Sequence, residues 1–137
     1  MKKLLSWVLR LVPAIILLQT LAFKFTAHPD SVALFTQLGL EPFGRIGIGV
    51  FELIAGILLL IPAVTRFGAL LSVGLMAGAI GSHLFILGIN YNGDGGTLFG
   101  MAVVVLVTAA ILVYRERATL LSDLRSLLGQ NATTSAA

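Results

Sequence analysis

The stretch Gly44-Arg45-Ile46-Gly47-Ile48-Gly49-Val50-Phe51-Glu52-Leu53-Ile54-Ala55-Gly56 continues as an apolar run to Ile61. It is long and apolar enough to cross a bilayer, which predicts a membrane helix. Glu52 lies near the centre of this helix, where a carboxylate costs roughly 2.5–3.5 kcal/mol on insertion scales. Because such groups usually face the protein interior and carry function, Glu52 is the predicted centre of any site.

The composition is that of an integral membrane protein. Apolar residues make up 58% of the 137 residues and charged residues 11%, whereas soluble domains average about 25% charged residues. The mean hydropathy is +1.02, and a chain of this length leaves no room for a separate soluble domain. The net charge of +3 does not indicate nucleic-acid binding, because the nine Lys and Arg residues form no basic patch. The absence of cysteine excludes disulfides and thiol chemistry.

Four apolar stretches predict four membrane helices. They cover about residues 4–25, 43–61, 67–87 and 97–114. The predicted fold class is therefore an all-α membrane protein, a four-transmembrane-helix bundle in one membrane domain over residues 1–128. By composition, residues 129–137 form a disordered C-terminal tail.

Between the first two spans the sequence predicts a short helix in the membrane interface. Asp30 or Ser31 can cap it, and Gly39 ends it after Leu38. The piece is amphipathic and too short to span.

The distribution of basic residues predicts the orientation of the bundle. With four alternating spans, seven of the nine Lys and Arg residues lie on the side of the termini, and only Lys24 and Arg45 lie on the other. The positive-inside rule then puts both termini in the cytoplasm.

The second span carries a polar stripe. Arg45, Gly49, Glu52 and Gly56 are spaced by four, three and four residues, so they share one helix face. The glycines allow another helix to approach that face closely. Arg45 lies about 10.5 Å along the helix from Glu52, too far for a direct pair. Glu52 therefore needs another partner or carries a proton, and both a structural and a functional role stay open.

Small residues also mark the third and fourth spans. Gly74 and Gly78 form a small-residue strip, and Gly100 lies on a similar face of the fourth span. His83, in the last turn of the third span, is read either as an interfacial hydrogen-bonding group or as a pocket residue. No metal site is expected, since no second imidazole or carboxylate stands at ligand spacing. The glycine-rich loop containing Asp94 is either a plain turn or a cover over a pocket near His83.

Arg10 and Lys24 share one face of the first span. The simplest interpretation is that the two side chains extend to opposite interfaces. The topology nevertheless gathers polar groups from several elements at one side of the membrane, above Glu52. Together they form the predicted ligand pocket: Lys24, Arg45, Glu52, His83 and Asp94.

The chain resembles the DoxX family of small bacterial membrane proteins over about residues 9–114. The resemblance rests on motifs in order: Leu9-Arg10-Leu11, Lys24, Phe35-Thr36-Gln37-Leu38-Gly39-Leu40, Phe51-Glu52-Leu53-Ile54-Ala55-Gly56, Thr65-Arg66-Phe67-Gly68-Ala69-Leu70, Met76 and His83. It departs at Leu21, where relatives usually carry glycine. The resemblance implies a four-helix bundle in the bacterial cytoplasmic (inner) membrane.

The family is heterogeneous, and some relatives are subunits of quinone-linked redox systems. The resemblance thus favours a non-catalytic accessory subunit with no intrinsic cofactor, whose pocket takes a quinone. An assembly factor that docks partner helices through its glycine faces is the alternative, and a small-solute or proton carrier is a weaker one. A stand-alone enzyme is not expected, because the chain lacks a nucleophile–base pair and paired carboxylates. Expected partners are the lipid bilayer and a membrane subunit or a second copy of the chain.

Overall fold

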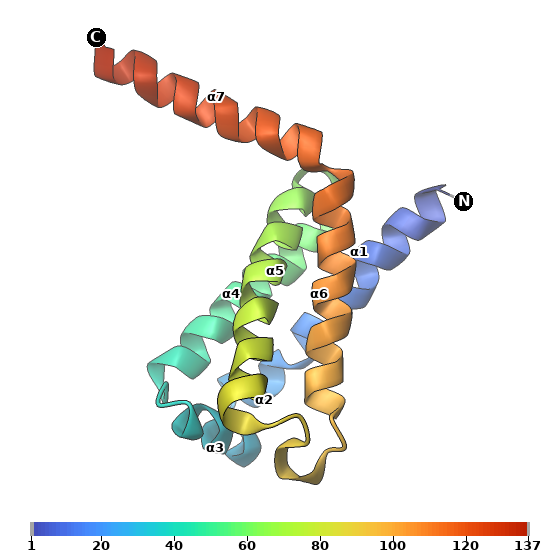
Figure 1. The fold of residues 1–137 in the computed structure, drawn as a ribbon, viewed down its shortest axis with the longest axis vertical. Coiled ribbons are helices and arrows are strands. Elements are labelled where there is room, and N and C mark those ends of the chain that lie inside the picture. Colours follow the sequence, from blue (N-terminus) through green and yellow to red (C-terminus); the bar gives the residue numbers. More distant parts are fainter. Residues whose placement is uncertain (1, 137) are drawn as a thin grey trace.

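The computed structural model describes residues 2–136, and the side chains of residues 2–129. Every regular element in this part of the chain is helical, and the long helices pack side by side as a bundle (Figure 1). The elements are α1 (Lys2–Gln19), α2 (Leu21–Phe25), α3 (Pro29–Gln37), α4 (Phe43–Leu60), η1 (Pro62–Val64), α5 (Thr65–Ser82), η2 (His83–Leu87), η3 (Tyr91–Gly93), α6 (Thr97–Arg115) and α7 (Arg117–Ala136).

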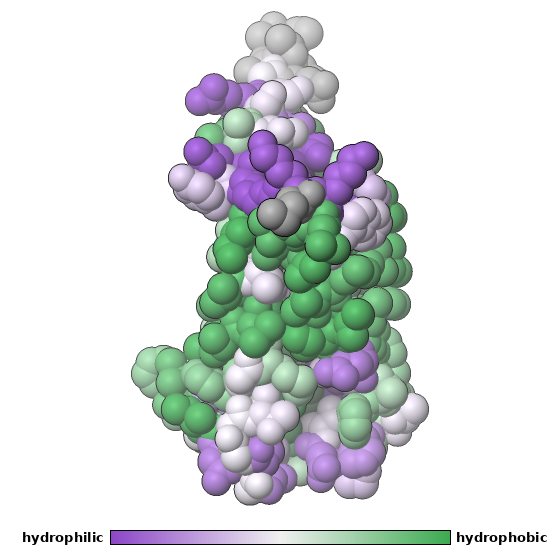
Figure 2. Space-filling model, turned by 90° about the vertical axis from the view of Figure 1, so that its right-hand side faces the viewer, coloured by the Kyte–Doolittle hydropathy of each residue, from purple (hydrophilic) through white to green (hydrophobic). Residues whose placement is uncertain are grey.

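The predicted four-span, all-α architecture is confirmed. Four helical stretches are long and apolar enough to cross a membrane: Lys2–Phe25, Phe43–Leu60, Pro62–Leu87 and Thr97–Arg115. The third begins five residues earlier than the sequence predicts, because the helical turn η1 leads directly into α5. On the face shown in Figure 2, an apolar band covers the middle of the bundle and lies between two more polar ends.

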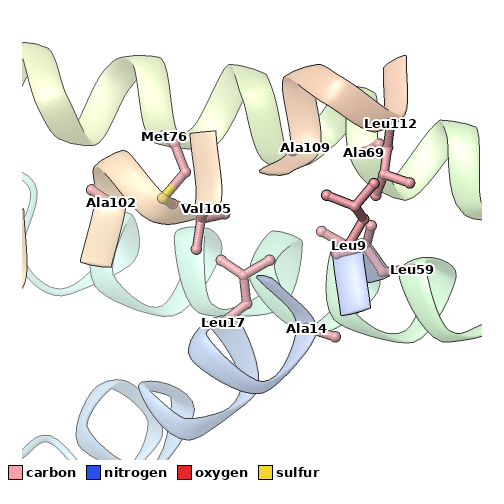
Figure 3. Close-up of a cluster of buried hydrophobic side chains, with 11 residues drawn as sticks. Leu9, Ala14, Leu17, Leu59, Ala69, Met76, Ala102, Val105, Ala109 and Leu112 are labelled. Atoms are coloured by element: carbon pink, nitrogen blue, oxygen red, sulfur yellow. The ribbon is translucent and has the colours of Figure 1, made fainter. Parts of the chain in front are cut away.

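The four long helices form a ring in which α1 and α5 each contact both α4 and α6. The two chain ends lie at the same end of this ring (Figure 1). Its core is filled by Leu9, Leu17, Leu59, Val105 and Leu112, together with smaller residues between them (Figure 3). Large apolar side chains such as Phe43 and Phe85 remain exposed on the outside, as expected for a surface that faces lipid.

Close approach of the helices depends on small residues, because lipid tails are as apolar as the core and provide no hydrophobic drive for association. Ala55 and Ala69 are fully buried between α4 and α5. A Cβ atom at Gly68 would lie 2.7 Å from the Leu59 nitrogen and 2.9 Å from the Ala55 oxygen. Gly68 is therefore the tightest point between these two helices, a role that its place in the family motif alone did not indicate.

A nine-residue helix, α3, lies between the first two spans. Its position in the membrane interface stays a prediction. The predicted caps are wrong: the N-cap is His28, whose Nδ1 accepts a hydrogen bond from the Asp30 N–H at 3.2 Å, with Pro29 at the first helical position. This fits the rule that proline is favoured at that position. Gly39 ends the segment as predicted, with a φ of +73°.

The C-terminal segment differs from the prediction. Helix α7 runs from Arg117 to Ala136, whereas the composition predicts disorder from Gly129 onward. A helix that has formed over the leucine-rich first half gains one hydrogen bond for each residue added, so it can continue into a polar segment. Helix α7 projects away from the bundle (Figure 1) and is held to α5 by the ion pair of Arg66 Nε with Asp123 Oδ2, at 2.6 Å.

Candidate functional site

Glu52 lies on the inward face of α4. It is only 5% exposed and shares that face with Arg45, Gly49 and Gly56, which are all buried. Its Oε2 atom lies 2.9 Å from Lys24 Nζ and 3.4 Å from Thr20 Oγ1. The single hydroxyl hydrogen of Thr20 has two acceptors, this carboxylate and the nearer Leu17 oxygen at 2.9 Å. The partner that the sequence could not name is thus the lysine that ends the first span.

Lys24 belongs to the short second part of the first span. The helix is interrupted at Thr20, and the short helix α2 continues to Phe25. Gly49 lets α2 approach α4: a Cβ atom there would lie 2.9 Å from the Phe25 ring and 3.5 Å from Lys24 Cβ. Neither Lys24 nor Arg10 extends to solvent, so the simplest interpretation of these two cations was wrong.

Gly56 serves the same approach about two turns further along α4. A Cβ atom there would lie 2.8 Å from a Leu18 methyl group. Both glycines of the stripe therefore stand where α4 meets the first span.

Arg45 does not contact Glu52. Its Nε donates to both carboxylate oxygens of Glu41, at 2.9 and 3.0 Å. Its Nη1 donates to the backbone oxygen of Lys24. Arg45 therefore holds the end of α2 against α4, and it does not line the cavity described next.

A cavity of about 820 Å³ opens inside the bundle, at the end that contains α3. Its walls come from the first four helices as well as α5, α6 and the loop before α6, and they are mostly apolar, with Leu17, Phe35 and Met76 among them. Lys24 and Glu52 line it together with Thr20. The cavity thus combines apolar walls with a buried ion pair.

His83 is the first residue of the π-helical turn η2, and it is 3% exposed. Its Nδ1 lies 2.9 Å from the Gly88 oxygen. Since a carbonyl oxygen only accepts, Nδ1 is assigned the hydrogen, and Nε2 is the remaining ring nitrogen. The ring packs edge-on against Phe99 and lines the cavity.

Asp94 also lines the cavity, and it caps α6. Its Oδ1 accepts from the Gly96 N–H at 2.8 Å and its Oδ2 from the Leu98 N–H at 3.1 Å. The Leu98 hydrogen bond is the main cause that lowers the pKa of Asp94 below its ordinary value, with further contributions from Gly96 and from nearby His83. The loop therefore does lie against the pocket, with Asp94 near His83.

The other glycines singled out in the sequence do not bring helices of this chain together. A Cβ atom at Gly74, Gly78 or Gly100 would meet nothing within 4 Å. Gly74 and Gly78 instead line the cavity.

Arg10 has a role that its position in the sequence did not indicate. It is 5% exposed, and its Nε and Nη2 donate to the Leu59 and Leu60 oxygens at 2.8 Å each. These carbonyls lie at the end of α4, where the backbone oxygens lack the usual partner four residues on. The Leu59 oxygen also accepts from Thr65 Oγ1 at 3.3 Å. Arg10 also lies over the Trp7 ring, 4.0 Å from its centroid. Arg10 therefore caps the C-terminal end of α4, while Lys24 pairs with the Glu52 carboxylate near the middle of that helix.

The site suits binding better than catalysis. An ammonium group, a carboxylate and a hydroxyl group meet at the wall of an apolar cavity. This arrangement can hold the polar part of a molecule whose remainder is apolar.

The comparisons with known proteins give one match. The family model DoxX matches residues 5–89. No curated protein matches the chain, and no solved structure matches it.

Proposed function

Since the chain belongs to the DoxX family, we propose that it is a non-catalytic accessory subunit of a quinone-linked membrane redox system. The cavity binds the quinone headgroup beside Lys24 and Glu52. One observation carries the proposal: the buried ion pair opens onto an apolar cavity within a bundle of membrane helices.

The chemistry of the ion pair fits both redox states of a quinone. A lysine ammonium has three N–H donors, and the pair with Glu52 uses one of them. The others can donate to a quinone carbonyl oxygen. The reduced form carries hydroxyl groups instead, for which the Glu52 carboxylate is an acceptor. Such hydrogen bonds to charged groups are stronger in an apolar surrounding than in water.

The dimensions of the cavity agree with this use. Ligand pockets commonly enclose about 300–1,000 Å³, are lined mainly by apolar side chains, and contain a few polar groups that orient the ligand. The cavity of about 820 Å³ lies in this range. Lys24, Glu52 and Thr20 supply the orienting groups on one wall.

The test is a titration of the purified chain in nanodiscs with a quinone analogue. Glu52→Gln and Lys24→Met should each weaken binding by at least about tenfold, the loss of one charge-assisted hydrogen bond. Asp123→Asn is the matched control, because it removes a carboxylate from an ion pair at the other end of the bundle. Membranes containing this chain alone should oxidise no substrate. If Glu52→Gln binds the analogue as tightly as the wild type, the proposed site is wrong.

The glycine positions support a second candidate, an assembly factor that docks partner helices. In the part of the chain that the structure describes, a Cβ atom at Gly74, Gly78 or Gly100 would meet nothing within 4 Å. Small residues are common where membrane helices meet. A partner that co-purifies with the wild type and with Glu52→Gln, but not with Gly100→Leu, would favour this role. Gly100 serves best here, because it does not line the cavity.

A further inference from the structure

We propose that the ligand of the cavity carries a long apolar chain, which leaves the bundle sideways between α4 and α5 at Gly74 and Gly78. The chain then lies in a groove on the lipid-facing side of α5. The ligand therefore reaches the site from the bilayer and not from water. This inference rests on the proposed function and specifies the class of molecule that the site accepts.

The groove is a second hollow, of about 510 Å³, on the outside of the bundle. It is almost wholly apolar and is lined by Phe51, Phe67, Leu70, Leu71, Gly74 and Leu75. Phe51 comes from α4 and the others from α5. Its surroundings belong to the part of the surface that faces lipid, since Phe51 is 51% and Leu70 45% exposed.

The groove and the cavity meet at shared residues. Gly74 and Leu75 line both of them. The buried face of α5 contains Ala69, Ser72 and Met76. Gly74 lies two residues from Ser72 and from Met76, about 200° around the helix, so it faces the opposite way. Because Met76 and Gly74 both line the cavity, the cavity extends around α5 from its inner side to its outer side.

The opening depends on the absence of side chains at Gly74 and Gly78. A Cβ atom at Gly74 or Gly78 would meet nothing within 4 Å. Gly74 lines both hollows, and Gly78 lines the cavity one turn further along α5. Helices α4 and α5 are joined at one end by η1, and they separate toward the end that contains α3 (Figure 1). The Cβ atom of a leucine at either glycine would meet no atom within 4 Å, so we expect its side chain to occupy the opening.

A chain of methylene or isoprenoid units matches this path. It would exchange contact with lipid for contact with the phenyl ring of Phe51 and with Leu70 and Leu71, which gives affinity through close packing. The headgroup would remain at Lys24 and Glu52, where the hydrogen-bonding groups are.

The experiment compares two analogues in nanodiscs of one lipid composition: a headgroup-only benzoquinone, and the same headgroup with a ten-carbon chain. The measured quantity is the ratio of the two Kd values. Each analogue partitions into the lipid to the same extent whichever variant is present, so differences in this ratio between variants report on the protein. Gly74→Leu and Gly78→Leu should each lower the preference for the chain, expressed as this ratio, at least about tenfold. Gly81→Leu is the matched control, because Gly81 also lies in open space on α5 but lines neither hollow.

The outcomes separate this inference from the proposed function. If the wild type binds both analogues and the glycine variants leave the ratio unchanged, the path is wrong and the headgroup site stands. If the variants weaken both analogues equally, the leucines act on the headgroup site and the path is again wrong. If the wild type binds neither analogue, the proposed function fails, and this inference with it. A ratio that falls in Gly81→Leu as well would also overturn the path, since the effect would not be local.

Discussion

Replacing Glu52 with glutamine removes the anion that faces Lys24 and keeps nearly the same shape. The side chains of Lys24 and Glu52 are only 13% and 7% exposed. Breaking a buried pair by removal of one partner typically costs about 3–5 kcal/mol, because the other charge stays buried. Two features reduce this energetic cost. Lys24 borders a cavity, and the polar groups of a chain that unfolds within a membrane find other partners. We therefore expect Glu52→Gln to lower the free energy of unfolding by about 2–3 kcal/mol.

The double variant isolates the pair. Lys24→Met together with Glu52→Gln removes both charges, and burial of neutral groups carries no such penalty, so the double variant should recover to within about 1 kcal/mol of the wild type. The assay is unfolding in mixed micelles with increasing dodecyl sulfate, followed by circular dichroism. Asp123→Asn serves as the control and should cost about 0.2–1 kcal/mol, because its carboxylate is more exposed. Additive losses in the double variant, or a loss below about 0.5 kcal/mol in Glu52→Gln, would refute the reasoning.

Three further predictions concern the helices that position the site. Gly68→Ala should destabilise the fold by about 1–3 kcal/mol, because the added Cβ atom would press on backbone atoms of α4. Gly47→Ala is the control and should cause no such loss, because a Cβ atom at Gly47 lies in open space. The same unfolding assay measures both variants. Arg10→Met should lower the free energy of unfolding by about 2–3 kcal/mol, because the Leu59 and Leu60 oxygens lose the Arg10 N–H donors. The exposed Arg115 is the control, and Arg115→Met should change the free energy of unfolding little. Equal losses in the two variants would contradict the capping role of Arg10. Because the pKa of Asp94 is lowered in the fold, its capping is complete above about pH 4 and is lost as the pH falls through the folded-state pKa. Amide exchange at Gly96 and Leu98, corrected for its intrinsic pH dependence, should then accelerate in the wild type, and Asp94→Asn should show no such step.

The sequence predicted the spans well, since hydropathy and length report directly on the bilayer. It also identified Glu52 as a buried carboxylate, because the spacing of Arg45, Gly49 and Gly56 places it on a glycine-lined face. The distance along the helix correctly separated Arg45 from Glu52. These inferences depend only on helix geometry within one span.

Contacts between spans were beyond the sequence. Lys24 was assigned to the interface because a lysine at the end of a span usually extends to it. Its contact with Glu52 depends on how α2 packs against α4, which the sequence of one span does not indicate. Arg10 was placed at an interface for the same reason. Its hydrogen bonds to the Leu59 and Leu60 oxygens, at the C-terminal end of α4, depend on how α1 packs against α4.

The glycines show the same limit. Spacing groups Gly74 and Gly78 with Gly49 and Gly56, yet only the second pair stands at a close approach within this chain. A glycine pattern indicates that another group can approach the helix backbone closely. Whether a helix, a ligand chain or lipid occupies the space depends on tertiary structure.

The central claim is that the ion pair of Lys24 and Glu52 holds a ligand headgroup, and native mass spectrometry of the chain extracted from its own membranes tests it most directly. We expect the wild type and Asp123→Asn to retain a non-covalently bound molecule with the mass of a quinone that bears an isoprenoid chain. Glu52→Gln should lose it at equal protein signal. A wild-type spectrum without such a molecule, or equal occupancy in Glu52→Gln, would contradict the claim.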